Sequence, residues 1–268
     1  MYKLLLVTNR QKVKDAFGGI ASWAYLGFKE PRVAGTVDEA LQTLSKHHVD
    51  GVIISLPEME QRRLIEIMNE RPLIPIVLED ETVTSEQVTE DVEQIGLLLN
   101  RVHADYSNDR TNTTEMMQMC RHEYFRKLLS GSEKDEEKVL RTLLMMRSKM
   151  DPWSPCMFME LTMPEDVGYL QGKWQYGADR LEVAMRNIFG AEKEGMRVLV
   201  SVVNDQRMFL IACPMIGEKQ PGVEKMQKLI HEHAQAGIEH VREFLCIELH
   251  VASEEVRENL LTLTQKGV

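Results

Sequence analysis

Short apolar segments alternate with amphipathic ones over the N-terminal part of the chain. Between the apolar segments, apolar residues recur at steps of three or four, which predicts helices. Apolar runs without polar alternation are typical of strands that are buried on both faces. The pattern therefore predicts an α/β fold with a doubly wound (flavodoxin-like) parallel sheet. Its predicted strands cover residues 2–7, 32–35, 51–55 and 73–78.

Polar side chains stand where three of these strands end. Thr8 and Asn9 follow the first strand, Ser55 closes the third, and Glu79 follows the fourth. In doubly wound sheets, functional groups gather beyond the carboxyl ends of the strands. We therefore take Thr8, Asn9, Ser55 and Glu79 as the candidate site.

The pattern changes after this sheet. Residues 79–93 contain seven acids and no Lys or Arg, and the apolar residues of 88–102 share one helical face. We find no apolar run that could form a fifth strand. A polar segment without periodicity begins at residue 104, so we place the first domain at 1–103.

A helical linker is predicted at 104–150, with helices at 113–130 and 133–150. The first helix carries an apolar stripe that includes Met117, Tyr124 and Leu128. Such a stripe is either a partner surface or a part of the core. We expect a homodimer through these helices; the alternative is an antiparallel hairpin that buries the same side chains internally.

Residues 151–268 form a second domain of a different kind. Strands separated by helices, with one hairpin, predict an α+β sandwich in which helices cover a single sheet. The predicted strands are 156–163, 196–203, 208–213 and 245–251, and the predicted helices are 176–189, 223–244 and 254–263.

Charge and composition exclude several kinds of partner. The 268 residues include 32 Lys and Arg against 42 Asp and Glu, which gives a formal net charge of −10. Nucleic acids and anionic membranes attract basic surfaces, so neither is expected as a direct partner. No apolar run has the length of a signal peptide core or a membrane span, and the cysteines are widely spaced. We expect a cytoplasmic protein.

Several segments of the first domain resemble a known family, in the same order along the chain. The segments MYKLLLVTNR, SWAYLGF, VAGTVDEAL and DGVIISLPE resemble response-regulator receiver domains. Receivers place two Mg²⁺-binding acids where this chain has Thr8 and Asn9, a phosphorylated Asp where it has Ser55, and a Ser or Thr where it has Glu79. The resemblance thus implies a pseudo-receiver, which has the fold without the phosphorylation chemistry.

The second half resembles the middle domain of AraC-type response regulators, which is a degenerate GGDEF-like domain. RHEYFRKLLSG and MFMELTMPED are similar to its lead-in helix and first strand. A nucleotide cyclase would carry Gly-Gly-Asp-Glu-Phe where this chain has Asn204-Asp205-Gln206-Arg207, and a metal-binding Asp where it has Glu160. We therefore predict no catalytic residue and no metal site. The family's helix-turn-helix units would begin beyond Val268, so DNA binding is expected only through a module outside this sequence.

Together these features predict a non-catalytic signalling or transcription-regulatory protein, an atypical response regulator. It would act through protein–protein contacts, with no cofactor, and its partners would be a second copy and other signalling proteins. Two alternatives stay open. The second domain senses a small molecule such as a nucleotide or a sugar, or it keeps residual cyclase-like activity.

Overall fold

The computed structural model describes residues 1–103, 112–163, 174, 176, 178–204, 206–218 and 221–267. The chain divides into two compact units, and each is built from two stretches of sequence. The first unit comprises Met1–Arg121 and Leu140–Ser148, and the second comprises His122–Val139 and Lys149–Val268. None of the described helices is long and apolar enough to cross a membrane.

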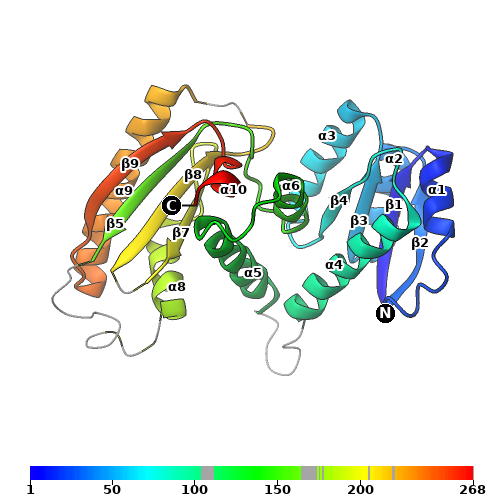
Figure 1. The fold of residues 1–268 in the computed structure, drawn as a ribbon, viewed down its shortest axis with the longest axis horizontal. Helices are drawn as coiled ribbons and strands as arrows, with labels where there is room; N and C mark the ends of the chain where they lie inside the picture. The colour runs from blue at the N-terminus through cyan, green and yellow to red at the C-terminus, as the bar shows by residue number, and fades with distance from the viewer. Residues whose placement is uncertain are drawn as a thin grey trace. The chain divides into compact units, whose positions relative to one another are not determined.

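The first unit contains a parallel sheet with strand order β2-β1-β3-β4 (Figure 1). This order and the covering helices confirm the predicted α/β class, and within residues 1–103 the sheet has no fifth strand. Its elements are β1 (Tyr2–Thr8), α1 (Gln11–Gly18), β2 (Phe28–Ala34), α2 (Val37–Lys46), β3 (Gly51–Ser55), α3 (Glu58–Ile67), η1 (Met68–Glu70), β4 (Ile76–Leu78) and α4 (Ser85–His103).

Strand β1 is buried on both faces because its apolar residues are contiguous. Leu4 and Leu6 pack in a cluster with α1 and α4, while Leu5 and Val7 pack in a second cluster with α2 and α3. Alternate residues of a strand point to opposite faces, so one short run supplies both cores. The polar side chains of β1 are therefore confined to the ends of the strand.

Two helices that follow the sheet complete this unit. They are α5 (Asn112–Leu129) and α6 (Glu136–Met145), each of which contributes residues to both units. Met117, Cys120 and Met145 pack in the cluster of α1 and α4, and Leu144 packs against the other cluster. The ends of α5 and α6 are therefore part of the core of the first unit.

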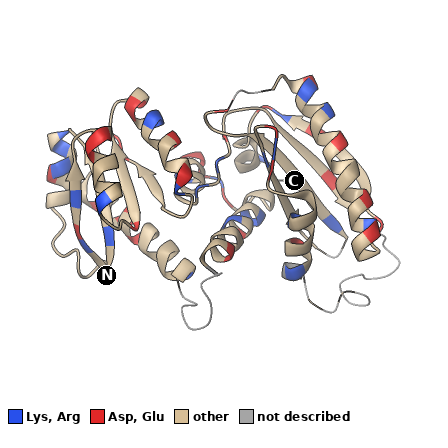
Figure 2. Ribbon diagram, turned by 180° about the vertical axis from the view of Figure 1, so that it is seen from behind, with Lys and Arg blue, Asp and Glu red and all other residues tan. Residues whose placement is uncertain are grey.

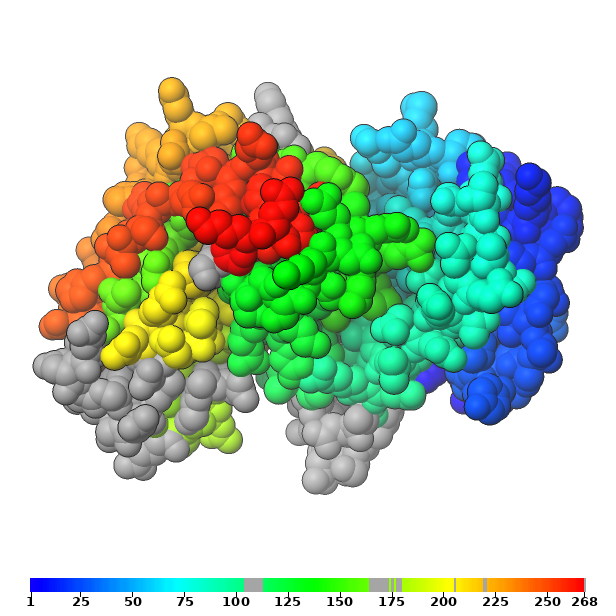
Figure 3. Space-filling view, viewed as in Figure 1, coloured from blue at the N-terminus to red at the C-terminus, as the bar shows by residue number. Residues whose placement is uncertain are grey.

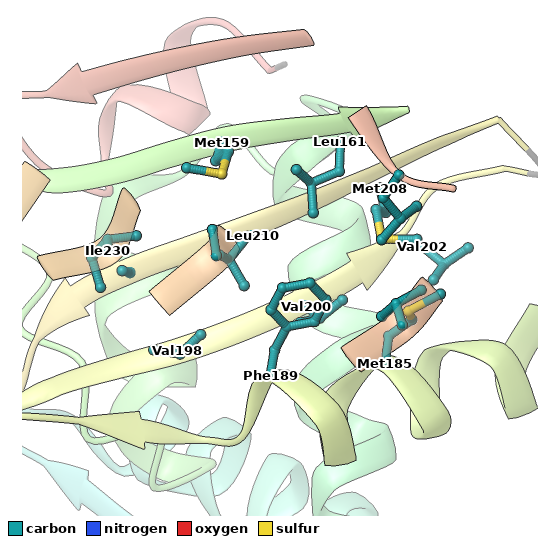
Figure 4. Packing of buried hydrophobic residues seen from close by; sticks show 14 of the residues in the cluster. Met159, Leu161, Met185, Phe189, Val198, Val200, Val202, Met208, Leu210 and Ile230 are labelled. Carbon is teal, nitrogen blue, oxygen red and sulfur yellow. The ribbon is translucent and has the colours of Figure 1, made fainter. Parts of the chain in front are cut away.

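The second unit is an antiparallel sheet with strand order β6-β7-β8-β5-β9. Helices α8 and α9 cover one of its faces, where Met159, Val200, Leu210, Met185 and Ile230 form a common core (Figure 4). Its elements are β5 (Cys156–Thr162), α8 (Ala178–Phe189), β6 (Glu192–Lys193), β7 (Met196–Val202), β8 (Arg207–Pro214), α9 (Val223–Leu245), β9 (His250–Arg257) and α10 (Thr262–Gln265).

The last part of the chain differs from the prediction. The expected strand at 245–251 is wrong in place, because α9 runs on to Leu245 and β9 occupies His250–Arg257. The expected helix at 254–263 is wrong as well, since only Thr262–Gln265 is helical. Pairing with β5 holds the Glu-rich residues of β9 in a strand at the surface of the unit (Figure 3). Tertiary pairing here overrides local helix propensity.

The exposed side of α9 carries charges of both signs (Figure 2). A face of mixed sign does not provide the basic stripe that a nucleic acid would require. The exposed charged residues are Glu224, Lys225, Lys228, Glu232, Glu239, Arg242 and Glu243.

Candidate functional site

The structure places three of the predicted site residues at one edge of the parallel sheet. Thr8 and Ser55 are register partners at the ends of β1 and β3. Glu79 follows β4, and its backbone N–H donates to the carbonyl of Ile54 at 2.9 Å. All three residues are buried, whereas Asn9 is exposed. We call Thr8, Ser55 and Glu79, with the residues that contact them, the strand-end site.

Arg10 contacts two of these buried hydroxyl groups and was not singled out from the sequence. Its backbone N–H donates to Oγ1 of Thr8 at 3.1 Å, and its Nη1 donates to Oγ of Ser55 at 3.3 Å. Its Nε lies 3.8 Å from Oε2 of Glu81. The strand-end site is therefore bound by a guanidinium of the same chain.

The carboxyl of Glu79 has no exposed side-chain surface. Burial, and then the hydrogen-bonding and charge of the nearby Asp91, raise the pKa of Glu79 to about 9, although Arg141 acts in the opposite direction. Desolvation disfavours the charged form of an acid, and a neighbouring carboxylate adds to this effect. Glu79 is therefore neutral at pH 7.

The acids that surround Glu79 are engaged by other side chains. Nη1 of Arg141 donates to Oδ2 of Asp91 at 2.7 Å, and its Nη2 lies 4.0 Å from Oε2 of Glu79. Hydrogen bonds from Thr82 lower the pKa of Asp80, and the charges of Arg141 and Arg10 contribute to that lowering. Two arginines therefore supply the positive charge at this edge of the sheet.

The donor set of the strand-end site does not suit Mg²⁺. This cation prefers carboxylate oxygens, but the strand ends themselves present two hydroxyls and a neutral carboxyl. The nearby carboxylate of Glu81 faces the guanidinium of Arg10. Across the described parts of the chain, no group of at least three His, Cys, Asp or Glu side chains is arranged to hold a metal ion.

In the second unit, the carboxylate of Glu160, which the resemblance predicted in place of a metal-binding Asp, is paired with other side chains. Glu160 accepts from Nε of Arg207 through Oε1 and from Oγ of Ser253 at 3.4 Å through Oε2. In the hairpin turn, Oδ1 of Asn204 accepts from the backbone N–H groups of Gln206 and Arg207. Asp205 lies outside the described residues.

The residues predicted to form a dimer surface are buried within the chain. Met117 and Leu128 are 0% exposed and Tyr124 is 7% exposed. Met117 packs among the residues of the first unit, and the other two belong to the second unit. Their assignment to a dimer interface is therefore corrected: the stripe is core. Sequence periodicity could not distinguish these cases, because both give an apolar helical face.

Comparison with known proteins yields a likeness among solved structures. No family model matches the sequence, and no curated protein matches it. Among solved structures, the chain is similar to the receiver domain of the Francisella response regulator 1452, at 18% identity and a TM-score of 0.26. The likeness covers 36% of this chain and 78% of that chain. At this TM-score it carries no argument, and the first unit is described by its own parallel strand order.

Proposed function

We propose that this protein is an atypical, response-regulator-like signalling protein that acts through protein–protein contacts and without phosphorylation of an Asp. The observation that supports this most strongly is the hydrogen bond between Arg10 and Ser55 at the end of β3. An acyl phosphate requires a carboxylate nucleophile, which Ser55 does not have. The receiver-like unit would therefore provide a binding surface rather than a phosphorylation switch.

Ser55 is also poorly placed to act as a nucleophile in its own right. A serine hydroxyl requires a general base to accept its proton, and its guanidinium partner cannot accept one. The carboxyl at the end of the adjacent β4, that of Glu79, is already protonated at pH 7 because its pKa is raised to about 9. Neither the guanidinium of Arg10 nor the carboxyl of Glu79 would therefore activate the hydroxyl of Ser55 as a nucleophile.

Incubation with acetyl phosphate and Mg²⁺ tests this proposal. We expect the intact mass of the protein to stay unchanged, and beryllofluoride with Mg²⁺ to leave its thermal unfolding curve unchanged. The variant Ser55→Asp should also remain unmodified, because Thr8 and Asn9 still provide no carboxylate for the metal. A phosphoryl group located on Ser55 of the unmodified sequence would refute the proposal.

For the second unit we propose a regulatory rather than a catalytic role. The pairing of Glu160 with Arg207 and Ser253 supports this, because a metal would have to displace both partners. Incubation with GTP and either Mg²⁺ or Mn²⁺, followed by chromatography of the nucleotides, tests the role. We expect no product; turnover that disappears in Glu160→Gln would show that the unit is an enzyme.

A further inference from the structure

Arg10 is fixed at the strand-end site by its backbone as well as by its side chain. Its N–H donates to the buried Oγ1 of Thr8, and α1 begins at the next residue, Gln11. The side chain is 28% exposed and reaches Ser55, which is fully buried at the end of the adjacent strand. The guanidinium therefore occupies a defined position and is not a freely moving surface charge.

The groups around this guanidinium are those that a cation would contact. Nη1 bonds to the hydroxyl of Ser55, Nε faces the carboxylate of Glu81 at 3.8 Å, and the charge of Arg10 also acts on Asp80. Hydroxyl and carboxylate oxygens are ligands of hard divalent cations. A divalent cation placed at the end of β3 would meet the same oxygens and would be repelled by the guanidinium.

We propose that Arg10 is the resident cation of the strand-end site and that it excludes divalent metal ions from the ends of β1 and β3. This inference deepens the proposed function, on which it rests. Arg10 holds the receiver-like unit in one metal-independent state. On this proposal the site differs from that of a receiver in two ways. Positions 8, 9 and 55 carry no carboxylate, and Arg10 adds a positive charge.

The effect of the missing carboxylates and the effect of Arg10 can be separated by introducing carboxylates with and without Arg10. The first protein carries Asn9→Asp and Ser55→Asp, and the second carries the same changes together with Arg10→Ala. Binding of Mn²⁺ is measured by the loss of the electron paramagnetic resonance signal of the free hydrated ion. We expect the protein without Arg10 to bind Mn²⁺ about tenfold more tightly, or better, because its carboxylates no longer pair with a guanidinium.

A matched control removes a positive charge elsewhere on the same sheet. Lys29 is exposed near the start of β2, and its register partner is Lys3, at the opposite end of β1 from Thr8. Lys29→Ala, introduced with Asn9→Asp and Ser55→Asp, should leave Mn²⁺ affinity unchanged. This control separates a local effect of Arg10 from a change in net charge.

Two results would overturn the inference. One is equal Mn²⁺ affinity with and without Arg10 in folded proteins, including no binding by either. The other is Mn²⁺ binding by the unmodified protein at the affinity of the variant that lacks Arg10. Circular dichroism checks the fold; if Arg10→Ala unfolds the protein, Arg10→Met keeps the aliphatic stem and replaces it in the comparison. Phosphorylation of Ser55, which would refute the proposed function, is a separate measurement from either result.

Discussion

The buried carboxyl of Glu79 links the stability of the first unit to pH. Its pKa rises from 4.5 to about 9 on folding, so the folded protein holds a proton that the unfolded chain releases between these values. Glu79 makes its full contribution to the free energy of unfolding below pH 4.5. That contribution is lost as pH rises toward 9. The loss amounts to at most about 1.4 kcal/mol for each pH unit.

Glu79→Gln removes this ionisation and keeps the shape of the side chain. We expect the free energy of unfolding of the variant to exceed that of the unmodified protein by a margin that grows between pH 5 and 9, because the amide never has to hold a proton. Urea unfolding at several pH values measures the margin. Glu90→Gln, at an exposed position on α4, is the matched control. Parallel stability curves for Glu79→Gln and the unmodified protein would contradict the raised pKa.

Only a part of the candidate site could be predicted from the sequence. Thr8, Ser55 and Glu79 could be placed together because parallel strands end at a common edge. Arg10 could not, since a side chain just beyond a strand can point to solvent or back across the strand ends, and packing decides which. The protonation of Glu79 was also hidden: the sequence shows a run of acids but not which of them is buried.

At the scale of elements, arginines connect α5 and α6 to the body of the first unit. Nε of Arg121 donates to the carbonyl of Met146 at 2.6 Å, and Arg141 pairs with Asp91 of α4. Nη2 of Arg147 donates to the carbonyl of Met68 at 2.8 Å and to Oδ1 of Asn69 at 3.2 Å. These bonds, together with the apolar contacts, make residues 140–148 a part of the first unit and not a free linker.

Arg147→Met tests how much this attachment contributes. Arg147 is 4% exposed, and burial lowers its pKa to about 10. Its guanidinium donates to the carbonyl of Met68 on η1, which also accepts from the backbone N–H of Arg71. We expect unfolding to require about 1–3 kcal/mol less free energy, because the variant loses the hydrogen bonds that the buried guanidinium donates to Met68 and Asn69. Chemical denaturation measures the change. Arg62→Met, at an exposed position on α3, should change stability by less than about 0.5 kcal/mol, and an equal effect at both sites would contradict this account.

The elements that sequence patterns predicted best are those that pack on apolar neighbours. The runs 51–55 and 196–203 match β3 and β7 closely because both strands are buried along their whole length. The edge strand β9 could not be recognised, since most of its residues are exposed and three of its eight are Glu or Arg in a stretch that suits a helix. Its conformation is set by β5, a partner far away in the sequence.

At the scale of the whole molecule, the chain passes between its two units within α5 and again within α6. A prediction from sequence assigned 104–150 to a linker because the polar segment at its start marks a break. Helical periodicity then shows that one face is apolar, but not that successive turns of that face belong to different cores. Residues 112–121 and 140–148 complete the first unit, whereas residues 122–139 belong to the second.

This division predicts that two substitutions on the same helix weaken different units. Met117 is fully buried with the first unit, and Leu128 is fully buried in the second, so each truncation to Ala leaves a cavity that costs about 2–5 kcal/mol. In hydrogen exchange, Met117→Ala should lower protection in β1 and β3 and leave β7 and β8 unchanged, and Leu128→Ala should do the reverse. Met119→Ala, at a position 39% exposed on the same helix, should change neither. The opposite reading, that the stripe is a dimer interface, requires that both variants keep full protection in each unit and that light scattering shows a dimer dissociating into monomers.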